Sequence, residues 1–257
     1  LRGAATPPFF VEASAAAGLD DLPAAYGLGL VFADLDADGW PDLYVANDSV
    51  DNLVLRNDGQ GRFEDVSRLS GAASDMAGRA QAGMGAALGD TDGDGDPDLV
   101  VTNFADEANT LYRNDGGLQF RDVSLPAGLG HISQPLLGWG VHLLDLDGDG
   151  ALDLFWTNGH VYPEADQASG DDRYAQPLVL LPGHGDGSFG ADAWPLPGLA
   201  VHRGSVAGDL DDDGDLDLLV LTLDGPPRLF VNTLDQPDRQ LLVDLRVGAR
   251  QAFGARL

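Results

Sequence analysis

The chain has 257 residues and a formal net charge of −28, from 42 acidic against 14 basic side chains. This charge argues against a nucleic-acid partner, because phosphate groups are bound by basic surfaces. Cysteine is absent, so no disulfide can hold the fold, and no run of 18 apolar residues predicts a transmembrane helix. With 44% hydrophobic residues, a chain of this length can bury a substantial core.

Four strands are predicted in the first repeat, and a leading segment is similar to the last of them. Residues 9–14 (FFVEAS) are similar to residues 63–67 (FEDVS), so we expect the closing strand of an earlier repeat there. The apolar runs are continuous and of strand length, as expected for strands buried on both faces. The four strands of this repeat are predicted at residues 27–33, 43–46, 52–57 and from residue 63 onward.

The same pattern returns three more times along the chain. Runs that match the second strand occupy residues 99–102, 154–157 and 218–221, and runs that match the third occupy residues 109–114, 180–181 and 227–232. No segment shows convincing helical periodicity. Four-stranded repeats of this length predict an all-β fold, a β-propeller with radially packed blades. Residues 1–235 are assigned to blades, and residues 236–257 either complete the last blade or begin a separate β module.

An acidic loop follows the first strand of every repeat and reads D-x-D-x-D-G-x-x-D-L. The four copies, named loops 1 to 4, occupy residues 34–43, 90–99, 145–154 and 209–218. Carboxylates stand at positions 1, 3, 5 and 9, and the glycine at position 6 permits the positive φ that a sharp turn needs. Alternate residues of a tight loop point inward, so these carboxylates should converge. The carbonyl at position 7 can help to close the cage.

An all-oxygen site with several carboxylates suits calcium, and we expect up to four ions, one in each loop. Without a cation, like charges so close together would repel one another. A single copy could be only an acidic turn, but four copies with one spacing favour ligand sets. The predicted ligands are Asp34, Asp36, Asp38, Trp40 and Asp42; Asp90, Asp92, Asp94, Asp96 and Asp98; Asp145, Asp147, Asp149, Ala151 and Asp153; and Asp209, Asp211, Asp213, Asp215 and Asp217.

Two other classes of calcium protein do not fit this pattern. An EF-hand requires a glutamate at position 12 of its loop and flanking helices. A calcium-binding β-helix would show nonapeptide repeats in tandem. Here the loops start at residues 34, 90, 145 and 209, and position 12 is occupied by Val45, Val101, Trp156 and Val220.

The third repeat contains an insertion at residues 158–176. Long loops inside compact domains are commonly functional or mobile, so His160, Tyr162 and Glu164 form a candidate ligand loop. The alternative is a loop that only caps the propeller. His142 lies between apolar residues and is predicted to have a structural role, whereas His184 lies in a turn and is predicted to be exposed.

The repeats resemble FG-GAP/VCBS-type repeats, and the second half is similar to the ASPIC/UnbV, or cartilage acidic protein-like, family. The similar stretches are WTNGHVYP at residues 156–163, GPPRLFVN at 225–232, LLVDL at 241–245 and FGARL at 253–257. The resemblance implies a secreted calcium-binding propeller of about seven blades, followed by a small β module. This chain would supply four of those blades. The alternative is a closed propeller of four or five blades.

These observations favour a non-enzymatic binding, scaffold or adhesion-type protein whose partner is a protein or a glycan. Weak multi-carboxylate sites fit the high calcium concentration outside cells, so we expect an extracellular or cell-surface location, with the periplasm as an alternative. Two other hypotheses stay open. One is a calcium-dependent hydrolase or lyase that acts on polysaccharide through the 158–176 loop, and the other is a subunit of an extracellular assembly.

Overall fold

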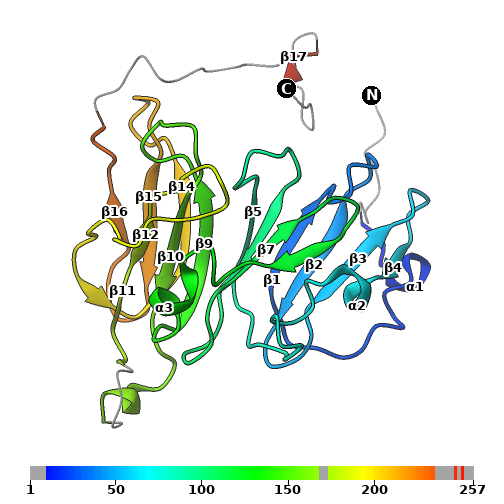
Figure 1. The fold of residues 1–257 in the computed structure, drawn as a ribbon, viewed down its shortest axis with the longest axis horizontal. Helices are drawn as coiled ribbons and strands as arrows, with labels where there is room; N and C mark the ends of the chain where they lie inside the picture. Colours follow the sequence, from blue (N-terminus) through cyan, green and yellow to red (C-terminus); the bar gives the residue numbers. More distant parts are fainter. Residues whose placement is uncertain (1–9, 168–172, 235–245, 248–249, 252–257) are drawn as a thin grey trace, which may run out of the picture.

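The computed structural model describes residues 10–167, 173–234, 246–247 and 250–251, and their regular structure is almost entirely antiparallel β-sheet. Four main sheets succeed one another along the chain, as Figure 1 shows. The first contains β1 (Gly27–Ala33), β2 (Asp42–Asn47), β3 (Leu53–Asn57) and β4 (Phe63–Asp65). The second contains β5 (Ala86–Gly89), β6 (Asp98–Val101), β7 (Thr110–Asn114) and β8 (Phe120–Asp122).

The later sheets have three strands each among the residues that the structure describes. The third contains β9 (Gly138–Leu144), β10 (Asp153–Asn158) and β12 (Val179–Leu181), and the fourth contains β14 (His202–Gly208), β15 (Asp217–Thr222) and β16 (Arg228–Phe230). Two short pairs lie outside the main sheets: β11 (Gln176–Pro177) with β13 (Leu199–Ala200), and β17 (Arg246–Val247) with β18 (Arg250–Gln251).

Helical structure is limited, in the described ranges, to four short segments. These are α1 (Ser14–Ala17), α2 (Ser67–Ser70), α3 (Leu129–Ser133) and the 3₁₀ turn η1 (Pro163–Gln167). No helix in the part of the chain that the structure describes has the length and apolar character needed to cross a membrane.

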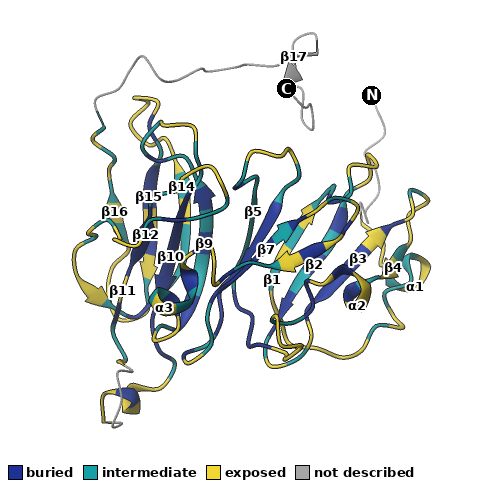
Figure 2. Ribbon diagram, in the orientation of Figure 1, coloured by how far each residue is buried: buried dark blue, intermediate teal, exposed yellow. Residues whose placement is uncertain are grey.

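The sheets stack face to face, and each interface has its own apolar cluster. Tyr44 of the first sheet packs in one cluster with Leu99 of the second, whereas Val100, the next residue, packs in a different cluster with Trp156 of the third. Phe155 then belongs to a third cluster that contains Val220 of the fourth sheet. Since neighbouring side chains of a strand point to opposite faces, the middle sheets are buried on both sides, as predicted. Figure 2 shows this burial in the inner strands and the exposure of most loops.

The first strands of successive sheets approach so closely that glycine is needed between them. A Cβ atom at Gly29 would lie 2.6 Å from the carbonyl oxygen of Met84, and one at Gly85 would lie 2.0 Å from that of Trp139. Real Cβ atoms do not come that near to a backbone oxygen. The repeated Gly-x-Gly segments therefore serve the packing of neighbouring sheets.

The two ends of the stack expose apolar residues that are buried elsewhere in the repeat. Leu219 of β15 is 39% exposed, whereas its counterparts Tyr44, Val100 and Phe155 have exposures of 0%. At the other end, Phe32 of β1 is 61% exposed, although β1 has a sheet packed on its opposite face. In Figure 1 the first and fourth sheets lie at opposite ends of the molecule, so the described residues do not form a closed ring.

Several predicted strands are absent. Residues 10–13 are not a strand and Ser14 begins α1, because the described chain has no third strand there with which a fourth could pair. In the third repeat the fourth strand is reduced to a single bridge between Gly183 and Phe189. Pro182 stands where the second repeat has Arg113, and proline has no N–H to donate. The predicted final segment, residues 236–257, lies outside the described residues except for β17 and β18.

Candidate metal centres

Each acidic loop joins the first strand of a sheet to the second. Loop 1 follows β1 directly, and its position 9, Asp42, is already the first residue of β2. The same holds for Asp98 in β6, Asp153 in β10 and Asp217 in β15. The loops are therefore tight connections whose two ends are fixed by antiparallel pairing, which positions the carboxylates between them.

Short hydrogen bonds inside each loop fold it in the same way. The carboxylate at position 1 accepts a bond from the N–H of the glycine at position 6, which has φ between 91° and 96°. The distances are 3.0 Å from Gly39 to Asp34, 2.9 Å from Gly95 to Asp90, 3.0 Å from Gly150 to Asp145 and 3.0 Å from Gly214 to Asp209. The carboxylate at position 5 accepts from the N–H at position 7, at 2.8–2.9 Å in all four loops.

Three carboxylates of every loop converge. One oxygen from each lies within 4.8 Å of the others in the sets Asp34, Asp36 and Asp42; Asp90, Asp92 and Asp94; Asp145, Asp147 and Asp153; and Asp209, Asp211 and Asp213. Positions 1 and 3 occur in every set, with position 5 or position 9 as the third member. The donors are all hard oxygens, so the residues present fit a calcium ion. The contact that the structure gives for the position-7 residues in all four loops is the one from their N–H groups to position 5, so their carbonyl oxygens stay predicted ligands.

The aspartate at position 9 also has a structural role that its motif does not reveal. Its side chain is almost fully buried in all four loops. One oxygen accepts the N–H of position 2, at 2.9–3.0 Å, and the other accepts a backbone N–H at the end of the third strand or its equivalent, at 2.8–2.9 Å. This residue therefore ties the loop to the rest of its sheet whether or not a metal is bound.

Burial and like charge raise the pKa of several carboxyl groups in the loops. Burial raises the pKa of Asp42 and Asp98, and it raises the pKa of Asp153 to about 6. The pKa of Asp36 is also raised, first by loss of solvent and then by the neighbouring aspartates. A bound dication would favour the charged forms and reverse this tendency.

Sequence reasoning missed a second left-handed residue in each loop. Position 4 has a positive φ throughout: 60° at Ala37, 75° at Gly93, 69° at Gly148 and 62° at Asp212. The signal was weak, because glycine occupies this position in only two loops. The alternating turn at positions 4 and 6 brings the flanking carboxylates inward.

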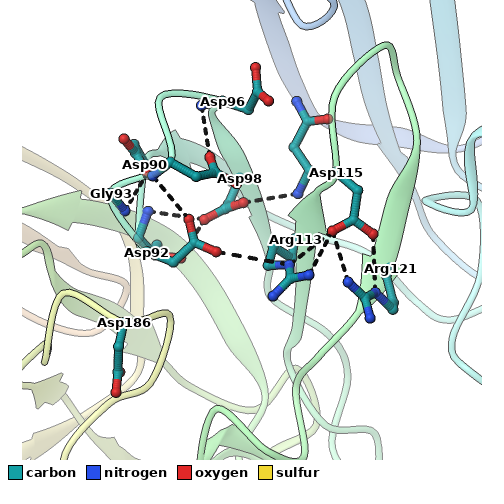
Figure 3. A network of polar contacts seen from close by, with 12 residues as sticks. Asp90, Asp92, Gly93, Asp96, Asp98, Arg113, Asp115, Arg121 and Asp186 are labelled. Carbon is teal, nitrogen blue, oxygen red and sulfur yellow. Dashed lines mark hydrogen bonds and ion pairs between the residues drawn. The ribbon is translucent and has the colours of Figure 1, made fainter.

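Loop 2 has a nearby network of charges, drawn in Figure 3. Arg113 lies 3.9 Å from Asp92 and 2.7 Å from Asp115, which also pairs with Arg121 at 2.8 Å. These side chains are a third or more exposed, apart from Asp92, so the pairs contribute little to stability. Their effect is a local positive charge beside a strongly acidic loop.

The predicted ligand loop of the third repeat does not present His160 to solvent. This side chain is only 6% exposed, packs edge-on against Phe104, and its Nδ1 lies 3.0 Å from the N–H of Tyr162. Tyr162 itself is 60% exposed. Glu164 lies in the exposed turn η1. His160 and Tyr162 are therefore neighbours with different surroundings, and a ligand role for the loop stays a prediction.

The structure confirms the roles predicted for two other histidines. His142 is partly buried, stacks on Phe155, and places its Nε2 3.0 Å from the hydroxyl of Ser205 in the next sheet. Burial lowers its pKa. His184 lies in an exposed turn, where its Nδ1 is 3.0 Å from the hydroxyl of Ser188.

Comparison with known proteins agrees with the repeats. A family model described as FG-GAP-like repeat matches residues 34–101 and 90–156. The chain is similar to cartilage acidic protein 1 of Mus musculus (28% identical over 222 residues, 81% of this chain and 30% of the relative) and of Homo sapiens (30% over 192 residues, 70% and 25%). The protein of Xenopus tropicalis is 27% identical over 201 residues (76% and 28%).

The chain spans only 25–30% of the length of these relatives. Among solved structures, a lectin from Agrocybe aegerita that recognises non-reducing terminal N-acetylglucosamine aligns with a TM-score of 0.45 at 20% identity, over 81% of this chain and 53% of that chain. A likeness of that size carries no argument about fold or ligand.

Proposed function

This chain belongs to the FG-GAP-repeat, cartilage acidic protein-like family, and we propose that it forms the calcium-binding blades of an extracellular binding or scaffold protein. Loops 1 to 4 would each hold one calcium ion. The propeller would then present its surface loops to a protein or glycan partner. The observation that carries the proposal is the recurrence of one loop geometry, with three converging carboxylates, in all four repeats.

The donor set favours calcium over magnesium. Each loop offers several carboxylate oxygens, with the carbonyl at position 7 as a further predicted ligand, which suits the irregular coordination of six to eight oxygens that calcium accepts. Magnesium demands near-octahedral geometry at shorter distances and retains its water more strongly. A bound ion would supply positive charge that links the first and second strands of a blade.

The exposed end faces support a larger propeller. Leu219 is exposed where its counterparts in the other sheets are fully buried, and Phe32 is exposed where Leu143, its counterpart in the third sheet, is buried. We therefore propose that further blades cover both ends of the stack, in a ring of about seven blades. If these apolar end faces stayed uncovered, they would promote aggregation.

An extracellular location follows from the chemistry of the loops and stays part of the proposal. Calcium reaches about millimolar concentrations outside cells, which would fill such sites even if each of them binds calcium only weakly. Filling four of them would leave the surface acidic, since the chain carries a formal net charge of −28. A partner with a basic surface, or a neutral glycan, is compatible with this charge.

A thermal unfolding experiment tests the calcium proposal. We expect a clear rise in Tm in millimolar calcium, relative to excess chelator, and a much smaller rise in magnesium. A site with a Kd of about 10 µM contributes roughly 2.7 kcal/mol at about 1 mM calcium. An Asp36→Asn variant should bind one ion fewer. An equal Tm in calcium and chelator would refute the proposal.

A further inference from the structure

Three of the loops are fastened to the sheet that follows them in the stack. The carbonyl oxygen at position 2 of loop 1, on Leu35, accepts a bond of 3.0 Å from the side-chain amide of Asn114. In loop 3 the carbonyl of Leu146 accepts a bond of 2.8 Å from the side-chain amide of Asn232. The donors are 79 and 86 residues away in the chain, and each belongs to the third strand region of the next repeat.

Loop 2 keeps this contact although its neighbour lacks the asparagine. Gly183 occupies the equivalent position in the third repeat, and the backbone N–H of Gly187 donates instead to the carbonyl of Thr91, at 2.8 Å. Gly187 has a φ of 82°, a backbone conformation that glycine adopts readily. The same carbonyl is thus satisfied by a different donor, so the contact is a property of the interface and not only of the asparagine.

Asn114 is itself rigidly held. It is 0% exposed, its backbone N–H donates to Asp98 at 2.9 Å, and its side-chain oxygen accepts the N–H of Gly116 at 3.0 Å. Its amide nitrogen lies 3.0 Å from the oxygen of Leu35 and 3.2 Å from that of Pro97. One amide group therefore bridges position 2 of loop 1 and position 8 of loop 2.

Position 2 is the residue through which such a contact can act on the metal site. It lies between the ligands at positions 1 and 3, and its N–H is held by the carboxylate at position 9. When its carbonyl is also held, both sides of the residue are fixed and the flanking carboxylates are aimed inward. Hydrogen bonds that orient metal ligands from outside typically change metal affinity by about 10–100-fold.

We propose that Asn114, Gly187 and Asn232 are positioning residues for the calcium sites of loops 1, 2 and 3, each acting from the following blade. The proposal rests on the calcium function proposed above. Its consequence is that a loop reaches full affinity only when the next blade is packed against it. Asn57 is the equivalent residue of the first repeat. Its side-chain amide donates to the carbonyl of Pro41 in its own repeat, at 2.9 Å, as Asn114 does to Pro97, but the described chain has no preceding loop for it to contact.

The test uses two variants of the whole chain in which a single loop can bind calcium. In the first background loop 1 remains, and in the second loop 3 remains; the others carry Asp→Asn at position 3. The substitutions are Asp92→Asn, Asp147→Asn and Asp211→Asn in the first, and Asp36→Asn, Asp92→Asn and Asp211→Asn in the second. Calcium affinity is measured by calorimetric titration with calcium chloride.

Asn114→Leu should weaken calcium binding about tenfold in the first background and leave it unchanged in the second. Asn232→Leu should do the reverse. Asn103→Leu removes a buried asparagine whose amide bonds only Ala108 and Thr110, away from the loops, and it controls for a general loss of packing. Asn114→Asp is a second variant of nearly equal size, which keeps the acceptor for the N–H of Gly116 and removes the amide donor to Leu35. Its added charge would on its own strengthen calcium binding.

The results separate the two proposals. Weakening confined to the contacted loop supports the positioning role, and weakening by Asn114→Asp supports it further. Equal weakening by Asn103→Leu, or unchanged affinity in both Asn114 variants, would overturn it while leaving the calcium proposal intact. If neither background binds calcium, the proposed function itself fails and the inference fails with it.

Discussion

Replacing Asp98 by alanine separates the two roles of position 9. Its carboxylate accepts the backbone N–H groups of Thr91 and Asn114, both at 2.9 Å, and also the hydroxyl of Thr91. All of these groups are buried. The substitution should therefore destabilise the protein even when no calcium is present, because the donors lose their acceptor in a place that water cannot easily reach.

The expected loss is several kilocalories per mole. Each buried donor left without a partner costs about 1–3 kcal/mol, and two backbone donors are affected. Removal of the buried carboxylate offsets part of this, since burial already raises the pKa of Asp98 and so opposes its charged form. We expect a decrease of about 3 kcal/mol in the free energy of unfolding in excess chelator.

Asp94 is the matched control in the same loop. It is a predicted ligand at position 5, it is exposed, and it accepts only the N–H of Asp96, at 2.9 Å. Asp94→Ala should cost less than about 1 kcal/mol in chelator, because water can replace the lost acceptor. In calcium it should lose a further contribution of about 2.7 kcal/mol, and Asp98→Ala should lose the same contribution in addition to its structural loss.

Urea unfolding in excess chelator and in millimolar calcium measures both effects, and calorimetry counts the ions bound. If Asp98→Ala were as stable as the parent chain in chelator, the structural role of position 9 would be wrong. If both variants kept the full number of bound ions, the assignment of loop 2 as a ligand set would be wrong.

Three further predictions follow from other parts of the fold. The raised pKa of Asp153, about 6, means that the folded state holds this proton more tightly than the unfolded state does. In chelator, the difference in the free energy of unfolding between the parent chain and Asp153→Asn should therefore fall by about 2 kcal/mol as pH rises from 4 to 7, and a flat difference in urea unfolding would contradict this. Gly85→Ala places a Cβ 2.0 Å from a facing carbonyl oxygen and should lower the free energy of unfolding by about 3 kcal/mol. Gly208→Ala, whose Cβ would meet nothing within 4 Å, should leave Tm almost unchanged, and equal Tm values for the two variants would refute the close approach of the sheets. Val100→Ala should lower the free energy of unfolding of this chain by about 2 kcal/mol. Leu219→Ala, at the equivalent but exposed position of the fourth sheet, should lower it by less than about 1 kcal/mol. The reverse order in thermal melts would show that the fourth sheet is already covered.

The repeat and the loop motif could be read from the sequence because their signals are local. Short strands and a turn with glycine at position 6 depend mainly on residues that are close in the sequence. The structure confirms both, with strands of three to seven residues in the four main sheets. The positive φ at Gly39 is required by the turn itself. For the same reason the all-β class and the existence of repeated antiparallel sheets followed from composition and periodicity, and the family comparison agrees.

Contacts between repeats were decided only by the tertiary structure. His160 is buried because other segments pack around it, and Phe10 belongs to no strand because no described strand pairs with its segment. Neither fact depends on the local sequence alone. The same applies to Asn114, whose pattern in the sequence looks like the end of a strand and whose partner is a loop 79 residues earlier. A motif specifies the directions of its own side chains. It does not specify which residue of a neighbouring repeat donates a hydrogen bond to one of its backbone carbonyls. In this protein the sequence alone determined the ligand set of each loop as a prediction, and the packing of sheet on sheet determined what holds that set in place.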